Sequence, residues 1–177
     1  KEDKTRKLEY MKKEMEDDFE NITDYTEFTL NADGRTWRKQ ELNFTNKFQV
    51  GDMVKIAGDN LLVSVPGLIG DQLFISQDER QREVDAYMGF PRSLRNIISF
   101  TIPAGYKVVG IQNLNMNIDN EAGTFAVQAS VEADKLTLLV KKHYKQMTVK
   151  KENWSKLLEM LDAAFNFSQK KVLLKKL

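Results

Sequence analysis

Side chains that commonly perform nucleophilic or acid–base chemistry are scarce in this chain. It contains no cysteine and one histidine, His143, so it offers no thiolate nucleophile, no cysteine-based zinc site and no multi-histidine metal site. A Ser-His-Asp triad would have to use His143, and no Gly-x-Ser-x-Gly motif accompanies it. On a predicted strand, His143 shares one face with Lys141 and Lys145, which indicates a solvated basic face rather than a general base.

Neighbouring carboxylates are the remaining residues that could carry acid–base chemistry. Three pairs occur, namely Asp17/Asp18, Asp78/Glu79 and Asp119/Glu121. The first pair lies in a charged predicted helix, the second is followed by arginines, and the third falls in a predicted turn, so a solvated surface explains all three. The sequence also lacks a phosphate-binding glycine loop and an EF-hand pattern. We therefore predict no catalytic, cofactor-binding or metal-binding residue.

Composition limits the classes of partner. The chain has 177 residues, the size of one domain, and its 27 basic residues nearly balance its 26 acidic residues. This balance disfavours a nucleic-acid partner, which usually requires a basic excess on one face. No apolar run approaches the roughly 18 residues that suggest a membrane span. The chain begins at Lys1 without a signal-peptide pattern, so we expect it to derive from a longer protein whose upstream part carries any export signal.

Two segments have a helical period. Near the N-terminus, apolar residues recur three or four positions apart, at Leu8, Met11, Met15, Phe19 and Ile22. This spacing predicts an amphipathic helix, which packing on the body of the domain would explain. We also assign residues 1–24 to a helix that connects the domain to an upstream module. A second stripe predicts a helix over residues 151–167, and it consists of Trp154, Leu157, Leu158, Leu161 and Phe165.

Short apolar runs separated by turn residues fill the region between the helices. Phe125 and Val127 alternate with polar or small residues, which predicts a strand with one buried face. The next run places Leu136, Leu138, Val140 and Tyr144 on one face, after a predicted turn at Ala133-Asp134. The fold class is therefore mainly β with flanking helices (α+β). We expect residues 25–177 to form one antiparallel, β-sandwich-like domain with its helix at the C-terminal end.

A break inside one predicted strand has a backbone explanation. Pro103 cannot donate a ladder hydrogen bond, and Gly105 tolerates backbone angles that other residues avoid. We expect this segment to bend the strand or to pass it to another sheet, with Tyr106 covering the corner. The segment is thus a predicted structural elbow rather than a ligand loop.

Three aromatic residues are less clearly part of the core, namely Trp37, Tyr87 and Phe90. If they were exposed together, they could stack on a sugar or a peptide. We retain them as candidate ligand contacts, although packing in the core or at an edge would also explain them.

Several motifs follow one another along the chain, namely Pro91-Arg-Ser93, Ile102-Pro-Ala-Gly-Tyr106, Val108-Val-Gly-Ile111, Asn120-Glu-Ala-Gly-Thr-Phe125 and Asn153-Trp-Ser-Lys-Leu-Leu158. As an ordered set, they resemble the C-terminal domain of unknown function that follows transglutaminase-like domains in envelope proteins of some Gram-negative bacteria. The resemblance covers roughly residues 25 to 177. It implies a periplasmic or cell-envelope accessory domain whose partner is the upstream transglutaminase-like domain of the same chain. It offers no functional residues to transfer, because the family domain has no established role.

We therefore expect a non-catalytic accessory or interaction domain of a larger exported transglutaminase-like or protease-like protein, with no cofactor. A carbohydrate- or peptide-binding β-sandwich module is the alternative, with a glycan or a peptide as its ligand. An enzyme with an unrecognised carboxylate-based site ranks third.

Overall fold

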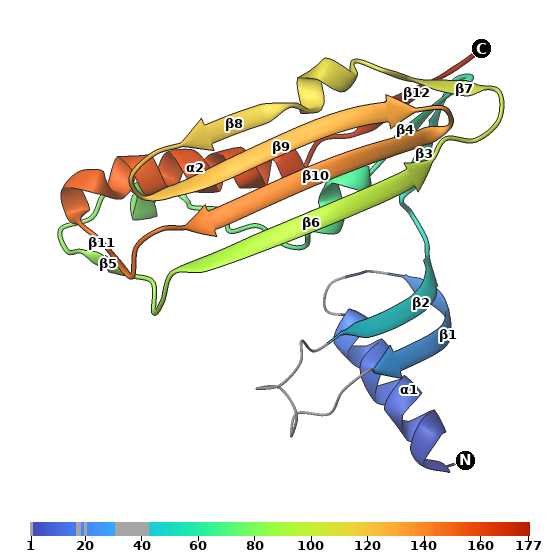
Figure 1. Ribbon diagram of the computed structural model, residues 1–177, viewed down its shortest axis with the longest axis horizontal. Helices are drawn as coiled ribbons and strands as arrows, with labels where there is room; N and C mark the ends of the chain where they lie inside the picture. The colour runs from blue at the N-terminus through green and yellow to red at the C-terminus, as the bar shows by residue number, and fades with distance from the viewer. Residues whose placement is uncertain (1, 17–18, 20, 31–42) are drawn as a thin grey trace. The chain divides into compact units, whose positions relative to one another are not determined.

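The computed structural model describes residues 2–16, 19, 21–30 and 43–177 (Figure 1). The chain divides into two compact units, Lys1–Met53 and Val54–Leu177. We expected a boundary after residue 24, whereas this division falls after Met53, because the strands that follow the first helix pair with each other.

The first unit contains one helix and one β-hairpin among its described residues. Helix α1 spans Glu2–Glu16, and strands β1 (Ile22–Leu30) and β2 (Phe44–Val50) pair in antiparallel fashion. The predicted helix over 1–24 is too long, since α1 ends at Glu16 and Ile22 begins β1. Asn21 adopts a positive φ of 59°, which a helix does not accommodate, and the threonine-rich segment after it favours a strand. Phe19 packs on the hairpin, with its ring centroid 5.3 Å from that of Phe48.

The second unit is built on an antiparallel sheet in the order β6-β10-β9-β8. Its strands are β6 (Arg92–Thr101), β8 (Met116–Asp119), β9 (Gly123–Glu132) and β10 (Lys135–Tyr144). The other antiparallel sheet has the order β3-β4-β12-β7, with β3 (Val54–Ala57), β4 (Asn60–Val63), β7 (Tyr106–Val109) and β12 (Val172–Lys176). A short ladder joins β5 (Ala86–Tyr87) to β11 (Thr148–Val149). These strands and helices confirm the predicted α+β class.

Helices complete this unit. Helix α2 spans Trp154–Ser168, close to the predicted 151–167, and lies along the sheet that contains β8 and β9 (Figure 1). The short 3-10 helices are η1 (Val65–Ile69), η2 (Gln77–Arg80), η3 (Ile111–Leu114) and η4 (Lys151–Asn153). The predicted stripe on α2 is buried at Trp154, Leu157, Leu158 and Leu161. Phe165 is half-buried, with its ring 5.1 Å from that of Phe74.

One core joins both sheets and α2. Leu136 and Leu138 of β10 are fully buried, as are Phe125 of β9 and Leu174 of β12. The Phe125 ring lies 5.9 Å from Phe167, which connects the sheet to α2. Because side chains alternate along a strand, burying the even-numbered side chains of β10 turns the odd-numbered ones to the other face. The β6-β10-β9-β8 sheet therefore has one buried face and one face open to solvent.

The Pro103-Ala-Gly105 segment carries the chain between the sheets. It lies between β6, in one sheet, and β7, in the other. The Tyr106 N–H donates to the Pro103 carbonyl at 3.2 Å, and Gly105 has a φ of 84°, as in a type II turn. The Gly105 carbonyl accepts a hydrogen bond from Leu177 N–H at 2.8 Å, so the turn also holds the C-terminal end of the chain.

We predict that Gly105→Val destabilises the fold by about 1 to 3 kcal/mol, because a β-branched residue is strained at positive φ. A Cβ at this position would meet no atom within 4 Å, so backbone strain alone sets the loss. Gly105→Asn is the matched control, since asparagine tolerates this region better. Urea denaturation measures both variants. Equal losses for Val and Asn would contradict this explanation of the turn.

Candidate functional site

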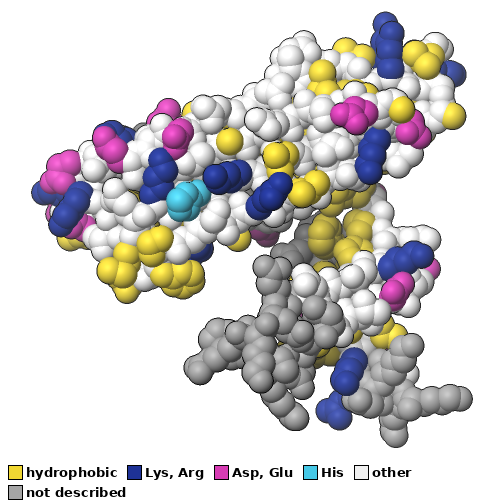
Figure 2. Space-filling view, in the orientation of Figure 1, with side chains coloured by type: hydrophobic (Ala, Val, Ile, Leu, Met, Phe, Trp, Pro, Cys, Tyr) yellow, Lys and Arg dark blue, Asp and Glu magenta, His cyan; other side chains and the backbone are white. Residues whose placement is uncertain are grey.

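A group of exposed hydrophobic side chains lies where β5 leads into β6. The exposed fractions are 72% for Tyr87, 63% for Phe90, 49% for Leu94 and 50% for Met147. Figure 2 shows hydrophobic side chains gathered at this end of the second unit. We call these four residues the β5–β6 patch. Trp37, the third aromatic candidate from the sequence, lies outside the described residues.

Local backbone structure places Tyr87 and Met147 on neighbouring segments. Tyr87 faces Thr148 across the β5–β11 ladder, while the Met88 N–H donates to the Met147 carbonyl at 2.7 Å. Gly89 adopts a φ of 79°, a conformation that favours glycine, and the chain turns there toward β6. The neighbour of Tyr87, Ala86, is buried, so alternation along β5 leaves the tyrosine ring in solvent.

Two cations flank an aromatic ring beside the patch. The Arg92 guanidinium carbon lies 4.6 Å from the centroid of the Tyr144 ring and 5.9 Å from that of Phe90. The Lys142 ammonium lies 5.2 Å from the Tyr144 centroid. Such positions are attractive because the face of an aromatic ring carries partial negative charge. Among the described residues, neither Arg92 nor Lys142 forms an ion pair with a carboxylate.

Lys142 is held by an amide instead. Its side chain faces the core, with 8% of the residue exposed, and its ammonium donates to Gln72 Oε1 at 2.8 Å. The Gln72 amide nitrogen donates to the carbonyls of Ile69 and Gly70, at 3.3 and 3.0 Å, which fixes the oxygen toward Lys142. We did not predict this lysine as part of a site. The sequence did indicate that Lys142 is buried, because it stands at an even position between Val140 and Tyr144 on the predicted buried face.

This arrangement can recognise a ligand, since exposed aromatic rings stack on apolar surfaces and on sugar rings. Arg92 adds donors in a planar fork that suits a carboxylate. Tyr87, Phe90 and Arg92 are close in the sequence, and the structure places the Arg92 guanidinium beside the Phe90 ring. The single histidine lies elsewhere, since His143 of β10 is on the open face of the sheet with Lys141.

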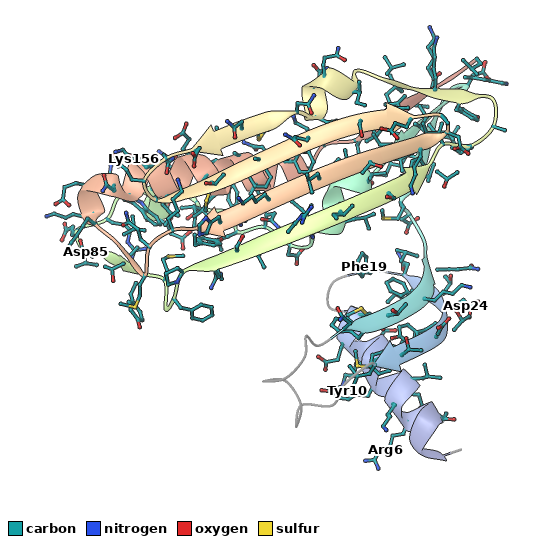
Figure 3. The ribbon with its side chains drawn as sticks, viewed as in Figure 1. Arg6, Tyr10, Phe19, Asp24, Asp85 and Lys156 are labelled. Carbon is teal, nitrogen blue, oxygen red and sulfur yellow. The ribbon has the colours of Figure 1, made fainter. Side chains whose placement is uncertain are left out.

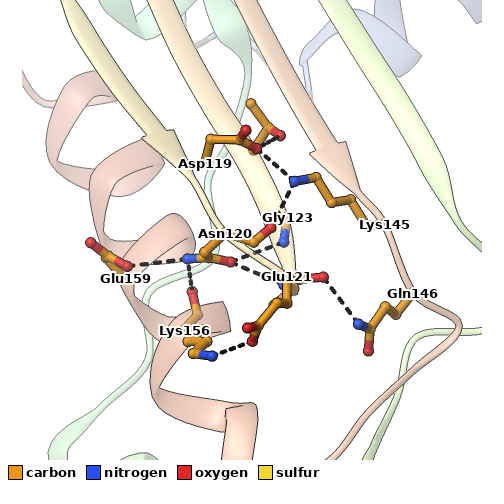
Figure 4. A network of polar contacts seen from close by, with 10 residues as sticks. Asp119, Asn120, Glu121, Gly123, Lys145, Gln146, Lys156 and Glu159 are labelled. Atoms are coloured by element: carbon orange, nitrogen blue, oxygen red, sulfur yellow. Dashed lines mark hydrogen bonds and ion pairs between the residues drawn. The ribbon is translucent and has the colours of Figure 1, made fainter.

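A polar network occupies the β8–β9 turn (Figure 4). Asp119 Oδ1 accepts hydrogen bonds from Lys145 and Thr124, both at 2.6 Å, and the Lys145 bond is the larger cause of the lowered pKa of Asp119. Glu121 forms an ion pair with Lys156 of α2. The carboxylates of this candidate pair therefore bind different lysines, as expected for surface residues that stabilise a turn.

Asn120 connects the same turn to α2. Its side-chain oxygen accepts from the Ala122 N–H at 3.0 Å, and its amide nitrogen donates to the Lys156 carbonyl at 2.9 Å. Of the other carboxylate pairs, Glu79 closes a capping box with Ser76, which lowers the pKa of Glu79. The pair Asp17/Asp18 lies outside the described residues.

Asp85 holds the start of the C-terminal helical segment (Figure 3). Its carboxylate accepts from the Lys150 ammonium at 2.8 Å and from the Lys151 N–H at 3.0 Å. The hydrogen bond from Lys150 is the main cause of the lowered pKa of Asp85. This contact fixes the segment that follows β11 next to the segment that precedes β5. It therefore stabilises the backbone of the β5–β6 patch.

The comparison with known families gives a match that lies within the second unit. Residues 63–174 match the family described as a domain of unknown function with a solved structure, DUF3858. The chain belongs to this family. No curated protein and no solved structure matches the chain. The matched region includes every residue of the β5–β6 patch as well as Gln72, Arg92, Lys142 and Tyr144.

Other features lie outside this site. A hollow of about 620 Å³ in the first unit lies beside α1 and β1, and Figure 3 labels Arg6 and Tyr10 from its wall. It falls outside the region that the family shares. Among the described residues, no group of three or more His, Cys, Asp or Glu side chains could hold a metal ion. No helix in the described part of the chain is long and apolar enough to cross a membrane.

The Lys142–Gln72 contact yields a prediction about stability. Gln72→Leu should cost about 1.5 to 3 kcal/mol, because it leaves a buried ammonium without its acceptor. Adding Lys142→Met should recover most of this loss, since a buried cation is often replaced by an apolar side chain at little cost. The single and double variants both lose the hydrogen bonds from Gln72 to the backbone. The difference between their free energies of unfolding therefore reports on the ammonium. Urea denaturation measures it, and a double variant no more stable than Gln72→Leu would refute this role.

Proposed function

We propose that this chain is a non-catalytic interaction domain of a larger, exported, transglutaminase-like or protease-like protein. In this proposal the β5–β6 patch contacts the transglutaminase-like domain of the same protein, in the periplasm or cell envelope. The observation that carries the proposal is the patch itself, four large hydrophobic side chains that are 49% to 72% exposed, with Arg92 beside the Phe90 ring. The family resemblance supports the identity of the neighbouring domain.

The composition of the patch is typical of an interface. Soluble monomers rarely expose large contiguous apolar patches, and those that they do expose are often functional. Tyrosine and arginine are enriched among the residues that contribute most to binding. Tyr87 and Arg92 lie at the two ends of a turn whose backbone is fixed by the β5–β11 ladder and by β6. The patch is therefore preorganised, which reduces the entropy lost on docking.

The alternative function is the binding of a glycan or a peptide. Two exposed rings, Tyr87 and Phe90, favour it because aromatic faces stack on sugars, and Arg92 could pair with an acidic group. The same residues serve both functions, so the experiment must identify what covers them.

Hydrogen–deuterium exchange on the full-length protein tests the proposal. Tyr87→Ser combined with Phe90→Ser should increase exchange in a segment of the transglutaminase-like domain, because that segment loses its cover. Ile56→Ser is the matched control, since Ile56 is 82% exposed and lies on β3, in the other sheet. If no segment outside this chain responds to the double substitution, the proposal is wrong. Glycan-array binding that is lost in the same variant would instead support the alternative.

A further inference from the structure

Strand β6 forms an open edge of its sheet. The whole of 54–177 is described, and within it β6 pairs only with β10. The pairing is continuous over ten residues, from Arg92 opposite Tyr144 to Thr101 opposite Lys135, without a bulge. No proline interrupts the strand. Long, regular edges of this kind are templates for pairing with another strand, and proteins usually protect them.

The ladder identifies which backbone groups face outward. Ile102 N–H donates to the Asp134 carbonyl at 2.6 Å, and this pair continues the β6–β10 register by one residue. Hydrogen-bonded and non-hydrogen-bonded pairs alternate along an antiparallel ladder. The even-numbered residues of β6 therefore bond to β10, while Ser93, Arg95, Ile97 and Ser99 direct their N–H and C=O groups away from it. No other backbone group of 54–177 bonds to these four residues.

The side chains of these residues lie on the open face of the sheet. Ile97 is 63% exposed opposite Leu139, and Arg95 is exposed directly opposite Lys141. Like charges directly opposite each other destabilise a sheet. Within 54–177 neither cation forms an ion pair. The charge of Lys141 contributes least to the lowered pKa of Asp119. The Asp119 carboxylate is already bound by Lys145 and Thr124, so it does not pair with Lys141. Figure 2 shows basic side chains beside the histidine on this face.

We infer that the edge of β6 binds an extended acidic segment of another polypeptide as an added strand. The backbone N–H and C=O groups of the bound segment would form hydrogen bonds with those of Ser93, Arg95, Ile97 and Ser99. A carboxylate beside Arg95 would neutralise the Arg95–Lys141 pair, while an apolar side chain would cover Ile97. These two side chains stand two residues apart on one face of the segment, about 6.6 Å. The ligand pattern is thus an acidic residue, any residue and then an apolar residue, in either direction.

Charge favours this occupant over a second copy of the chain. Pairing two β6 strands would bring a second Arg95–Lys141 pair to the same edge, since β6 contains arginines and no acidic residue. Repulsion between these cations opposes such a dimer. The inference is independent of the β5–β6 patch, because it depends on the odd-numbered residues of β6 and on Lys141.

The test uses a capped peptide, Thr-Glu-Thr-Val-Thr-Glu-Thr-Val-Thr, and a control peptide with lysine in place of glutamate. Titration calorimetry on the chain should detect the glutamate peptide and bind it at least about tenfold more tightly than the lysine peptide. Ser99→Pro should weaken binding at least about tenfold, because it removes an outward N–H. It should leave the fold intact, since proline is tolerated where an edge N–H faces solvent. Ser99→Ala, which retains the N–H, should bind within about twofold of the unsubstituted chain.

Arg95→Glu provides a second test that does not depend on proline. It should reverse the preference, so that the lysine peptide binds more tightly than the glutamate peptide. Equal binding of both peptides, no binding at millimolar concentration, or an unchanged preference in Arg95→Glu would each overturn the inference. Sedimentation showing a dimer that Ser99→Pro dissociates would also overturn it, because the edge would then be occupied by a second copy.

Discussion

The β6-β10-β9-β8 sheet can turn only one of its faces to a core, and the rest of the second unit is arranged around that limit. Leu136, Leu138 and Val140 point toward α2 and the other sheet, and all three are buried. Strand alternation then places Leu139, Lys141 and His143 in contact with solvent. The core thus determines where the open face lies and which residues occupy it, including the cationic pair with Arg95 on β6.

The same constraint explains the cations near Tyr144. Lys142 lies on the core-facing side of β10, where an ammonium is costly without an acceptor. Gln72 supplies that acceptor from a segment 70 residues away, and the Tyr144 face supplies a second favourable contact. Arg92, directly opposite Tyr144, reaches the same ring at the end of the sheet. The charged group beside the β5–β6 patch is therefore positioned by the register of β6 on β10.

Local periodicity predicted the elements whose burial follows it. The stripe on α2 and the alternation of Phe125 and Val127 were visible in the sequence because each faces one continuous core. The N-terminal helix was predicted too long, since Ile22 continues the helical spacing although it begins β1. The pairing of β12 with both β4 and β7 could not be predicted, because no local sequence pattern identifies the partners of a strand when they are distant in sequence. The even position of Lys142 on β10 indicated its burial, but its acceptor Gln72 lies far along the chain and could not be predicted.

Within 54–177, strand β6 pairs on one side only, and amide hydrogen exchange resolved by residue tests this arrangement most directly. Asn96, Ile98 and Phe100 bond to β10 in this account, so their amides should exchange slowly. The amides of Arg95, Ile97 and Ser99 point into solvent and should exchange at least about tenfold faster. Uniform protection along β6 in the chain alone would contradict the account, because it would mean that the edge is already covered.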